Sequence, residues 1–391
     1  LKLLSISGPS TGLRAMSERK VLITGGTGLL GREVVAHFCK CGFAVTTISS
    51  HPMERLHQQV QHLLKSHEVT HLELDLAEDV EHNGAAKLEE VIATGGYELI
   101  VHLAADRGGI KWDGERKSMN NPVLNTELPA VMGIIATKLG VRVFHMSTEY
   151  VWSGDDNTPE GYPAVPIGTD PRFVGANAMA YAAQKRDAEE RLTGNPNVTI
   201  IRIPVLYGPM LNALEDGTAG TSINDFLTEN AWKHDTWQRR YPTYSTDVAI
   251  ILVALAKKLF DTGLKKQVYQ YGAQAKVSKF EFMQLFVQAS GLSKEAEMHA
   301  PVPDDAGSRP PDKRPPFDVL LDISEIREEL TEAGLWCEPR GLDVRMVRKT
   351  WLSFFKDEVN KFKNDPDSWG FCTESSATTR QSQGLNSVGV Y

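Results

Sequence analysis

Three residues suited to acid–base chemistry lie near the middle of the chain: Thr148, Tyr181 and Lys185. Tyr181 and Lys185 are four residues apart, so on a helix they project from the same face. A tyrosine hydroxyl has a reference pKa of about 10, and a nearby ammonium favours its ionised form. If the Thr148 hydroxyl orients a carbonyl group, Tyr181 can protonate the carbonyl oxygen while a hydride donor attacks its carbon. Most isolated Tyr-x-x-x-Lys pairs are ordinary helix surface, so this interpretation depends on the rest of the chain.

A glycine-rich stretch near the start of the chain supplies that context. Residues 20–23 read as a short buried strand, glycines follow at 25, 28 and 31, and residues 33–38 continue as an amphipathic helix. In this arrangement Gly25 lets the chain turn with positive φ, while Gly28 lets the backbone approach a pyrophosphate and Gly31 lets the helix pack closely. The anion would lie on the unpaired N–H groups at the helix N-terminus. We therefore predict a nicotinamide dinucleotide site that includes Thr24, Gly25, Thr27, Gly28, Leu29, Leu30 and Gly31.

The pattern of apolar segments predicts the fold class. Further strands are expected over 43–48, 72–76, 99–105 and 141–147, with helices between them, one of them over 54–68. Alternating strands and helices predict an α/β protein with a doubly wound parallel sheet, a modified Rossmann fold. The length of 391 residues suits about two domains. We expect a flexible leader over 1–17, a dinucleotide-binding Rossmann domain over 18–210, a smaller C-terminal α/β substrate or partner lobe over 211–360 interleaved with it, and a disordered tail over 361–391.

The ends of the later strands provide the remaining candidate cofactor contacts. After the second strand comes Ser49-Ser50-His51, with no carboxylate until Glu54. An acidic residue there binds the ribose of NAD, whereas small polar or basic residues admit the 2′-phosphate of NADP, so NADP(H) is favoured over NAD(H). A solvated loop is the alternative for each of these three residues. We also assign to the cofactor site Asp75 and Leu76, facing the adenine, the strand-end residues Leu103, Ala104 and Ala105, Asn125 on the helix before the fifth strand, and the pair Tyr181 and Lys185.

Composition argues against several classes of function. A net charge of −8 does not suit a nucleic-acid surface, which needs clustered Lys and Arg. The four cysteines lack zinc or redox spacing, which fits a reducing compartment, and we expect a cytoplasmic protein. The longest apolar run, 249–256, is too short to span a bilayer. Histidines recur every five residues over 57–67, which spreads them around a helix, so no metal site is predicted.

The second half of the chain carries fewer signals. Trp237, Arg239 and Arg240 are candidate substrate or partner contacts, with the arginines as anion binders; a core tryptophan with solvated arginines is the equal alternative. Helices are expected over 245–260, 278–290 and 341–358, a long loop near the site over 153–177, and a proline-rich linker or rim over 301–316. Ser324 is a candidate N-cap of a further helix.

Together these motifs resemble the extended short-chain dehydrogenase/reductase superfamily. The resemblance implies that residues 24–31 bind the cofactor, that Thr148, Tyr181 and Lys185 carry the chemistry, and that the segment 202–209, including Pro204, lies beside the nicotinamide. Residues 147–152, STEYVW, look most like the branch that contains dTDP-4-dehydrorhamnose reductase. That branch implies an NADPH-dependent reductase of a 4-keto nucleotide sugar. Dehydratase or epimerase chemistry is not favoured, because dehydratases of the superfamily usually carry a carboxylate pair here and Glu149 stands alone.

A narrower resemblance is to the regulatory β subunit of methionine adenosyltransferase. It is carried by residues 234–243, HDTWQRRYPT, and by Asp247-Val248-Ala249 after them. It implies a reductase-fold protein that binds NADP and a methionine adenosyltransferase catalytic subunit, in S-adenosylmethionine synthesis. The chain departs from that family at Ser49-Ser50-His51, where an arginine pair is usual, at Thr148, where serine is usual, and in its polar C-terminal end. We expect the regulatory function, with the reductase as the alternative; the set Thr148, Tyr181 and Lys185 does not discriminate between them.

Overall fold

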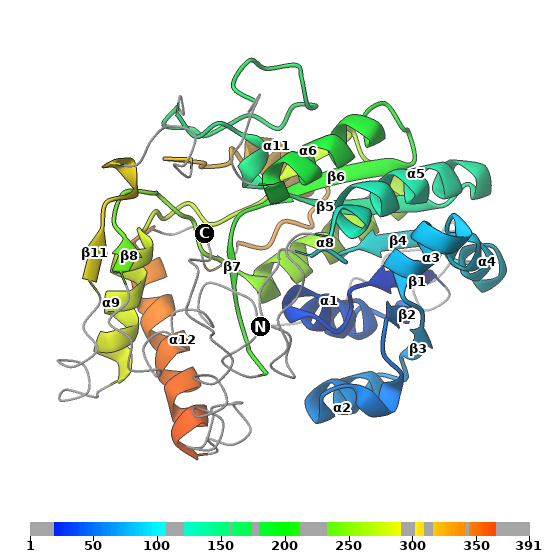
Figure 1. Cartoon of the computed structure of the whole chain (residues 1–391), viewed down its shortest axis with the longest axis horizontal. Coiled ribbons are helices and arrows are strands. Elements are labelled where there is room, and N and C mark those ends of the chain that lie inside the picture. Colours follow the sequence, from blue (N-terminus) through cyan, green and yellow to red (C-terminus); the bar gives the residue numbers. More distant parts are fainter. Residues whose placement is uncertain are drawn as a thin grey trace.

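A parallel sheet of seven strands runs through the described part of this computed structural model, in the order β10-β6-β5-β4-β1-β2-β3 (Figure 1). Its strands are β1 (Lys20–Thr24), β2 (Ala44–Ser49), β3 (Thr70–Glu73), β4 (Leu99–His102), β5 (Arg142–Thr148), β6 (Val198–Ile203) and β10 (Val268–Gln270). Each neighbouring pair is parallel. The order reverses between β1 and β4, the kind of switch point at which open α/β sheets bind ligands. The predicted doubly wound α/β fold is confirmed.

The structure describes residues 19–106, 121–155, 158–173, 180–211, 233–290, 302–308, 316–338, 340 and 344–364. The predicted leader over 1–17, the tail beyond 364 and much of the proline-rich stretch lie outside the described residues. Within 153–177, the described part carries isolated β-bridges at Tyr162 and Phe173.

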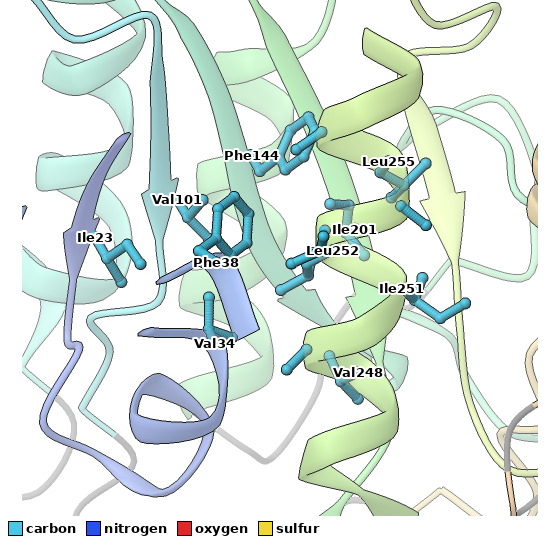
Figure 2. Close-up of a cluster of buried hydrophobic side chains, with 14 of the residues drawn as sticks. Ile23, Val34, Phe38, Val101, Phe144, Ile201, Val248, Ile251, Leu252 and Leu255 are labelled. Carbon is cyan, nitrogen blue, oxygen red and sulfur yellow. The ribbon is translucent and has the colours of Figure 1, made fainter. Parts of the chain in front are cut away.

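One face of the sheet is covered by α1 (Leu29–Lys40) and α8 (Ser245–Thr262), which are distant in sequence and pack side by side. Both helices carry apolar residues at three- and four-residue spacing, the pattern of a helix with one buried face. Figure 2 shows Phe38 of α1 and Leu252 of α8 gathered with Val101 and Phe144 of the sheet. α2 (Gln58–Ser66) and α11 (Ser324–Glu332) add buried side chains to the same cluster.

The opposite face is covered by the helices that lie between β3 and β6 in sequence. They are α3 (Leu76–Asn83), α4 (Ala86–Gly95), the π-helical turn η3 (Val123–Glu127), α5 (Leu128–Leu139) and α6 (Ala180–Leu192). Their core includes Leu88, Met132 and Leu192, packed against Ile100 and Val143 of the sheet. Residues at even steps along one strand share a face, so the side chains two residues beyond Ile100 and Val143 also point toward α5 and α6.

A smaller lobe is built from later segments. β8 (Lys233–Asp235) pairs in parallel with β11 (Val302–Asp304), and α9 (Lys279–Ser290) packs on α12 (Val344–Asn364) beside them (Figure 1). The core of this lobe is aromatic and contains Tyr207, Phe282 and Phe355. β7 (Leu206–Tyr207) and β9 (Thr243–Tyr244) form a short parallel pair that leads into α8.

Several predicted element boundaries are wrong by a few residues. The third strand ends at Glu73 and not at 76, and the fourth ends at His102 and not at 105. The expected helix 54–68 is a 3-10 turn, η2 (Met53–Arg55), followed by α2, because the His57 ring accepts a hydrogen bond from the Gln59 N–H and caps a new helix. The last helix extends to Asn364 and not to 358.

The N-cap of α11 is Ile323, so the prediction that Ser324 caps this helix is wrong. Ser324 is instead the first helical residue. Its N–H and its hydroxyl donate to the two carboxylate oxygens of Asp322, at 2.8 and 3.0 Å. The acceptor for the first N–H of the helix therefore lies two residues before the serine.

Candidate functional site

The glycine-rich turn between β1 and α1 lies at the switch point of the sheet. Gly25 has a φ of +70°, a region that favours glycine, and a Cβ on it would lie 2.8 Å from the backbone nitrogen of Ala104. The Thr24 carbonyl accepts from the Leu103 N–H at 3.2 Å, and the Thr24 hydroxyl accepts from the Ala104 N–H at 3.4 Å. The structure thus brings four predicted cofactor residues together, with the exposed Ala105 next along the chain.

Gly28 and Gly31 have different surroundings. A Cβ on Gly31 would lie 2.0 Å from the Gly25 carbonyl oxygen, so α1 packs on the turn more closely than a side chain allows. A Cβ on Gly28 would meet only that same oxygen among the described residues, at an ordinary 3.5 Å. Gly28 is the N-cap of α1 and has an extended backbone, with φ −77° and ψ 179°. Gly31 is therefore required by the fold, whereas the space at Gly28 can admit a ligand.

The N-terminus of α1 has the electrostatics of an anion site. No side chain caps it and its first turn, residues 29–31, holds no acidic residue, so the helix leaves its first N–H groups and its positive dipole end without an internal partner. Arg32, 8% exposed, donates to the carbonyls of Thr27 at 3.2 Å and Pro209 at 3.0 Å. Its guanidinium adds positive charge beside the turn. These features fit the pyrophosphate of a dinucleotide.

The end of β2 lies beside this cradle, because Ile48 is in register with Thr24. The Ser49 hydroxyl donates to the His51 carbonyl at 2.9 Å. Ser50, between them, is exposed. The three residues predicted to meet the ribose therefore form a tightly turned strand exit next to the glycines.

Asp75 and Leu76 lie beyond β3, at the start of α3. The Asp75 carboxylate accepts from the N–H groups of Ala77 at 3.0 Å and Glu78 at 3.1 Å. Leu76 is 6% exposed and belongs to the core cluster that contains Ile48. The carboxylate is engaged in capping the helix, and the adenine contact of this pair stays a prediction.

Asn125 is fully buried on η3. Its side-chain oxygen accepts from the Asp106 N–H at 2.9 Å, and its amide nitrogen donates to the Asp106 carbonyl at 2.6 Å and to Gln184 Oε1 at 2.7 Å. These contacts fasten the segment after β4 to α6. Asn125 thus helps to fix the position of the chain just after β4.

The three predicted catalytic residues come from two elements that pack together. Thr148 is the last residue of β5, and its buried hydroxyl accepts from the Tyr150 N–H at 3.3 Å. Tyr181 lies half-buried in the first turn of α6, and Lys185 follows one turn later. α6 packs against β5 and against the 3-10 turn η4 (Glu149–Val151). All three residues therefore lie toward the edge of the sheet at which the cradle opens.

Lys185 carries a buried charge at this edge. Its side chain is 2% exposed, its Nζ donates to the Met146 carbonyl at 2.6 Å, and it lies 3.2 Å from His145 Nε2. Burial lowers the pKa of Lys185 to about 8, while the Glu189 carboxylate opposes that change. The side chain is therefore an ammonium at neutral pH and loses its proton under mildly alkaline conditions.

Two buried histidines near Lys185 are not among the site residues predicted from the sequence. His102 ends β4 and His145 lies opposite it on β5, with ring centroids 5.3 Å apart and an interplanar angle of 24°. Among the described residues, His102 Nε2 and His145 Nδ1 have no hydrogen-bond partner. The signal that could have found them is a polar residue at an inward-facing strand position, two residues after Ile100 and Val143.

The Arg202 side chain is enclosed by protein, and its partners lie outside the cofactor cradle. It is 0% exposed, donates to both carboxylate oxygens of Glu189, and donates to Gln270 Oε1 at 3.3 Å. The rings of Trp152 and Phe173 lie 5.3 and 5.1 Å from its guanidinium carbon. Farther along the same predicted segment, buried Pro204 packs against Gly272.

Trp237 and Arg239 converge on one aromatic side chain of the smaller lobe. The Trp237 and Phe317 rings have centroids 4.9 Å apart. The Arg239 guanidinium lies 5.9 Å from the same Phe317 ring and 3.9 Å from the Glu281 carboxylate. Both residues are half-buried. The tryptophan packs on an aromatic ring, as a core residue does, while the arginine stays partly accessible, as an anion binder must.

Arg240 contacts the turn that follows Thr148. Its Nη1 donates to the Tyr150 hydroxyl at 3.0 Å, two residues after Thr148. Gln238, close by in sequence, is fully buried, and in the described part of the chain neither of its amide atoms has a hydrogen-bond partner. The lobe thus brings one predicted anion binder, Arg240, to the turn that follows β5.

Neither a membrane span nor a metal site is found where the structure can be described. Over those ranges no helix is long and apolar enough to cross a membrane. Over the same ranges no group of three or more His, Cys, Asp and Glu side chains is placed to hold a metal ion.

The sheet order and the glycine turn define a Rossmann-like α/β protein of the nucleotide-binding type. The chain belongs to the family described as the RmlD substrate binding domain, which matches residues 19–338. The rat methionine adenosyltransferase 2 subunit beta is 27% identical over 277 residues, covering 70% of this chain and 73% of the rat protein. A probable dTDP-4,6-dihydroxy-2-methyloxan-3-one 4-ketoreductase of Streptomyces antibioticus is 28% identical over 159 residues, covering 37% and 45%. The predicted resemblances are confirmed.

Solved structures show the same fold. The Bordetella bronchiseptica enzyme WbmG, in complex with NAD, has a TM-score of 0.62 at 19% identity, covering 87% of this chain and 94% of its own. The dTDP-4-dehydrorhamnose reductase of Bacillus anthracis, in complex with NADP, has a TM-score of 0.56 at 18% identity, covering 87% and 99%. The chain is thus homologous to the β subunits and shares its fold with the reductases, and both functional readings are compatible with these comparisons.

Proposed function

We propose that this chain is a β-type regulatory subunit of a methionine adenosyltransferase, which binds NADP(H) and attaches to a catalytic subunit. The observation that carries the proposal is the extent of the similarity to methionine adenosyltransferase 2 subunit beta. In the Xenopus tropicalis protein it covers 313 residues, 79% of this chain and 82% of the relative. The family match over residues 19–338 spans all seven strands of the sheet and part of the smaller lobe. A cytoplasmic location, predicted from the cysteine usage, is part of this proposal.

The cofactor part of the proposal is supported by the cradle. The uncapped N-terminus of α1, the open space at Gly28 and the Arg32 guanidinium suit a pyrophosphate. Ser49, Ser50 and His51 beside it offer no carboxylate to repel a 2′-phosphate, which favours NADP(H) over NAD(H). Bound there, the dinucleotide would supply hydride transfer at its nicotinamide.

A reductase of a 4-keto nucleotide sugar is the second candidate, and a specific arrangement favours it. Tyr181 and Lys185 occupy successive turns of α6, and α6 packs against β5, which ends at Thr148. In this reading the Tyr181 hydroxyl gives its proton to the carbonyl oxygen, and the Lys185 ammonium stabilises the phenolate that remains. Thr148 and Arg240 would orient the substrate at the end of β5.

The test mixes the purified protein with the methionine adenosyltransferase catalytic subunit of the same organism, with and without NADP⁺. A complex that elutes as one species on a sizing column, with altered kinetics of S-adenosylmethionine synthesis, is the expected result. Separate elution of two folded proteins, at concentrations that saturate NADPH binding, would reject the subunit proposal.

The reductase candidate has its own measurement. NADPH oxidation is followed with 4-keto nucleotide sugars for the wild type and for Tyr181→Phe. If the chain is a reductase, the variant loses turnover by a factor of about 10² or more and keeps its affinity for NADPH. Equal turnover in both would remove Tyr181 from the proposed chemistry.

A further inference from the structure

A row of buried polar side chains crosses the sheet beneath the candidate site. The backbone register places Thr24 of β1 opposite His102 of β4, and His102 opposite His145 of β5. The exposed fractions of these side chains are 0%, 1% and 0%. All three point toward α5 and α6, because they lie two residues after members of the apolar core on that face.

Contacts run along this row without interruption. Thr24 Oγ1 lies 2.7 Å from His102 Nδ1, the two imidazoles stack with centroids 5.3 Å apart, and His145 Nε2 lies 3.2 Å from Lys185 Nζ. The row begins at the residue that opens the glycine-rich turn and ends at the lysine of the candidate site. It therefore joins the cofactor cradle to Lys185 through the middle of the sheet.

The charges along the row are fixed by burial. Burial lowers the pKa of His102 to about 3 and holds the pKa of His145 well below its ordinary value, and the nearby Lys185 ammonium acts in the same direction. Both imidazoles are therefore neutral at physiological pH. A neutral imidazole accepts at one nitrogen only, so a hydrogen bond from the ammonium requires the His145 proton to be on Nδ1.

We propose that His145 is a positioning residue for Lys185: its unprotonated Nε2 accepts a hydrogen bond from the ammonium and holds it at the end of β5, while Thr24 and His102 fix the imidazole from the other side. The ammonium then has two acceptors within the sheet, His145 Nε2 and the Met146 carbonyl. That the positioned ammonium serves a bound dinucleotide rests on the proposed function, whereas the contacts between His145 and Lys185 do not. Loss of one acceptor from a buried ammonium lowers its pKa further.

Other charged groups around Lys185 set the background for this test. Glu189, on α6 itself, is paired with Arg202 of β6. On the elements packed against α6, the titratable or charged groups besides His145 are Arg142 on β5, Glu149 and Tyr150 on η4, Glu127 on η3, which pairs with Arg191 at the surface, and Lys138 on α5, which pairs with Glu89. His102 lies on β4, against His145. Since substitution of His145 removes none of these other groups, a change in the titration of Lys185 can be assigned to the lost acceptor.

The first experiment measures the free energy of unfolding in urea between pH 6 and pH 11 for the wild type, His145→Phe and His145→Gln. Each is compared with the same protein carrying Lys185→Met, so that the difference isolates the lysine. The folded pKa of Lys185, about 8, lies below the unfolded value near 10.4. Between these values the unfolded chain binds more protons, so stability rises with pH in this window.

In His145→Phe the lysine-dependent rise is expected to start about one pH unit lower than in the wild type. In His145→Gln, whose amide oxygen can accept, it is expected to start near the wild-type pH. Phe144→Leu is the matched control, because Phe144 is the neighbouring residue on β5 and points to the opposite face, against α8. A rise that starts at the same pH in His145→Phe and the wild type would overturn the proposal.

The second experiment needs no variant and no cofactor. Nitrogen chemical shifts of ¹⁵N-histidine-labelled wild-type protein report which ring nitrogen of His145 carries the proton. The proposal requires Nδ1–H with Nε2 unprotonated. A proton on Nε2, or an imidazolium, at neutral pH would overturn it. An NADPH titration of the same sample tests the proposed function separately, since failure to bind NADPH leaves the tautomer and the Lys185 titration unchanged.

Discussion

Gly28 and Gly31 stand three residues apart in one motif, yet the structure gives them different tasks. A methyl group on Gly31 would lie 2.0 Å from the Gly25 carbonyl oxygen, so backbone has to move. A methyl group on Gly28 would find only a van der Waals contact, and the extended φ of −77° suits any residue. Gly31 therefore allows the close packing of α1 on the turn, whereas Gly28 leaves open space beside it.

Gly28→Ala and Gly31→Ala are expected to separate binding from stability. Gly28→Ala should unfold within about 1 kcal/mol of the wild type, the scale of an N-cap change, and should bind NADPH at least roughly tenfold more weakly, because the methyl group occupies the place of a phosphate. Gly31→Ala should lose about 1–3 kcal/mol of stability, as overpacked sites do. Urea unfolding and NADPH fluorescence titration measure the two effects. Unchanged affinity in Gly28→Ala would contradict the cradle.

The geometry of Gly25 and Gly31 could be predicted because a tight turn and a close helix approach are local demands that only glycine meets. The partners of Lys185 could not be predicted in this way. His145 lies 40 residues before Lys185 in sequence, and the two meet only after β5 and α6 have packed. A histidine inside an apolar strand reads equally well as a satisfied core residue, so its position becomes informative only when the face it shares is known.

Among the secondary-structure elements, α6 carries most of the candidate chemistry. Tyr181, Lys185 and Glu189 recur every four residues along it, which places them on one side of the helix. Glu189 and Arg202 are each 0% exposed, and their ion pair joins α6 to β6. An uncompensated charge is strongly unfavourable in such a place, so the position of α6 depends on this pair.

Glu189→Ala is expected to lower the free energy of unfolding by about 3–5 kcal/mol, because it leaves the Arg202 guanidinium buried without its carboxylate. Glu190→Ala is the matched control: its side chain is 56% exposed and lies 3.8 Å from Arg186, and the change should cost less than about 0.5 kcal/mol. Urea unfolding at pH 7 gives both values. The double variant Glu189→Leu with Arg202→Met should recover much of the loss, and a cost for Glu189→Ala as small as that of Glu190→Ala would contradict the assignment.

The order of the elements could be predicted from the sequence, whereas several of their ends could not. Strand–helix alternation predicts a parallel sheet, and each of β1 to β5 overlaps the apolar segment that indicated it. The predicted end of β3 was wrong because the Asp75 carboxylate caps a new helix there. Hydrophobic periodicity does not reveal this local competition. The loop after β5 reads as irregular in sequence, but buried Gln270 fastens it by donating to the Tyr162 carbonyl at 2.7 Å and accepting from the Trp152 indole N–H at 3.2 Å.

At the scale of the whole molecule, one edge of the sheet gathers groups from described segments that are far apart in sequence. β1 contributes the glycine turn, β2 the strand exit at Ser49 to His51, β5 and α6 the pair Thr148 and Lys185, and the smaller lobe Arg240, which reaches Tyr150 at 3.0 Å. A ligand that spans this edge would contact all of these segments at once. Its binding should therefore stabilise the folded chain as a unit.

This coupling predicts how the melting temperature responds to cofactor. A ligand at 100 times its Kd adds about 2.7 kcal/mol to the stability of the folded state, so saturating NADPH should raise the Tm by several degrees. NADH at the same concentration should raise it less, because the exit of β2 is the expected site of the 2′-phosphate and holds no carboxylate for a ribose hydroxyl. Ser50→Asp places a carboxylate on an exposed side chain there and should reverse the order of the two cofactors, while Ser66→Asp, at the exposed end of α2, should leave it unchanged. Suppose that NADPH and NADH raise the Tm equally in the wild type and that Ser50→Asp does not favour either cofactor. The end of β2 then does not distinguish a ribose 2′-phosphate from a 2′-hydroxyl.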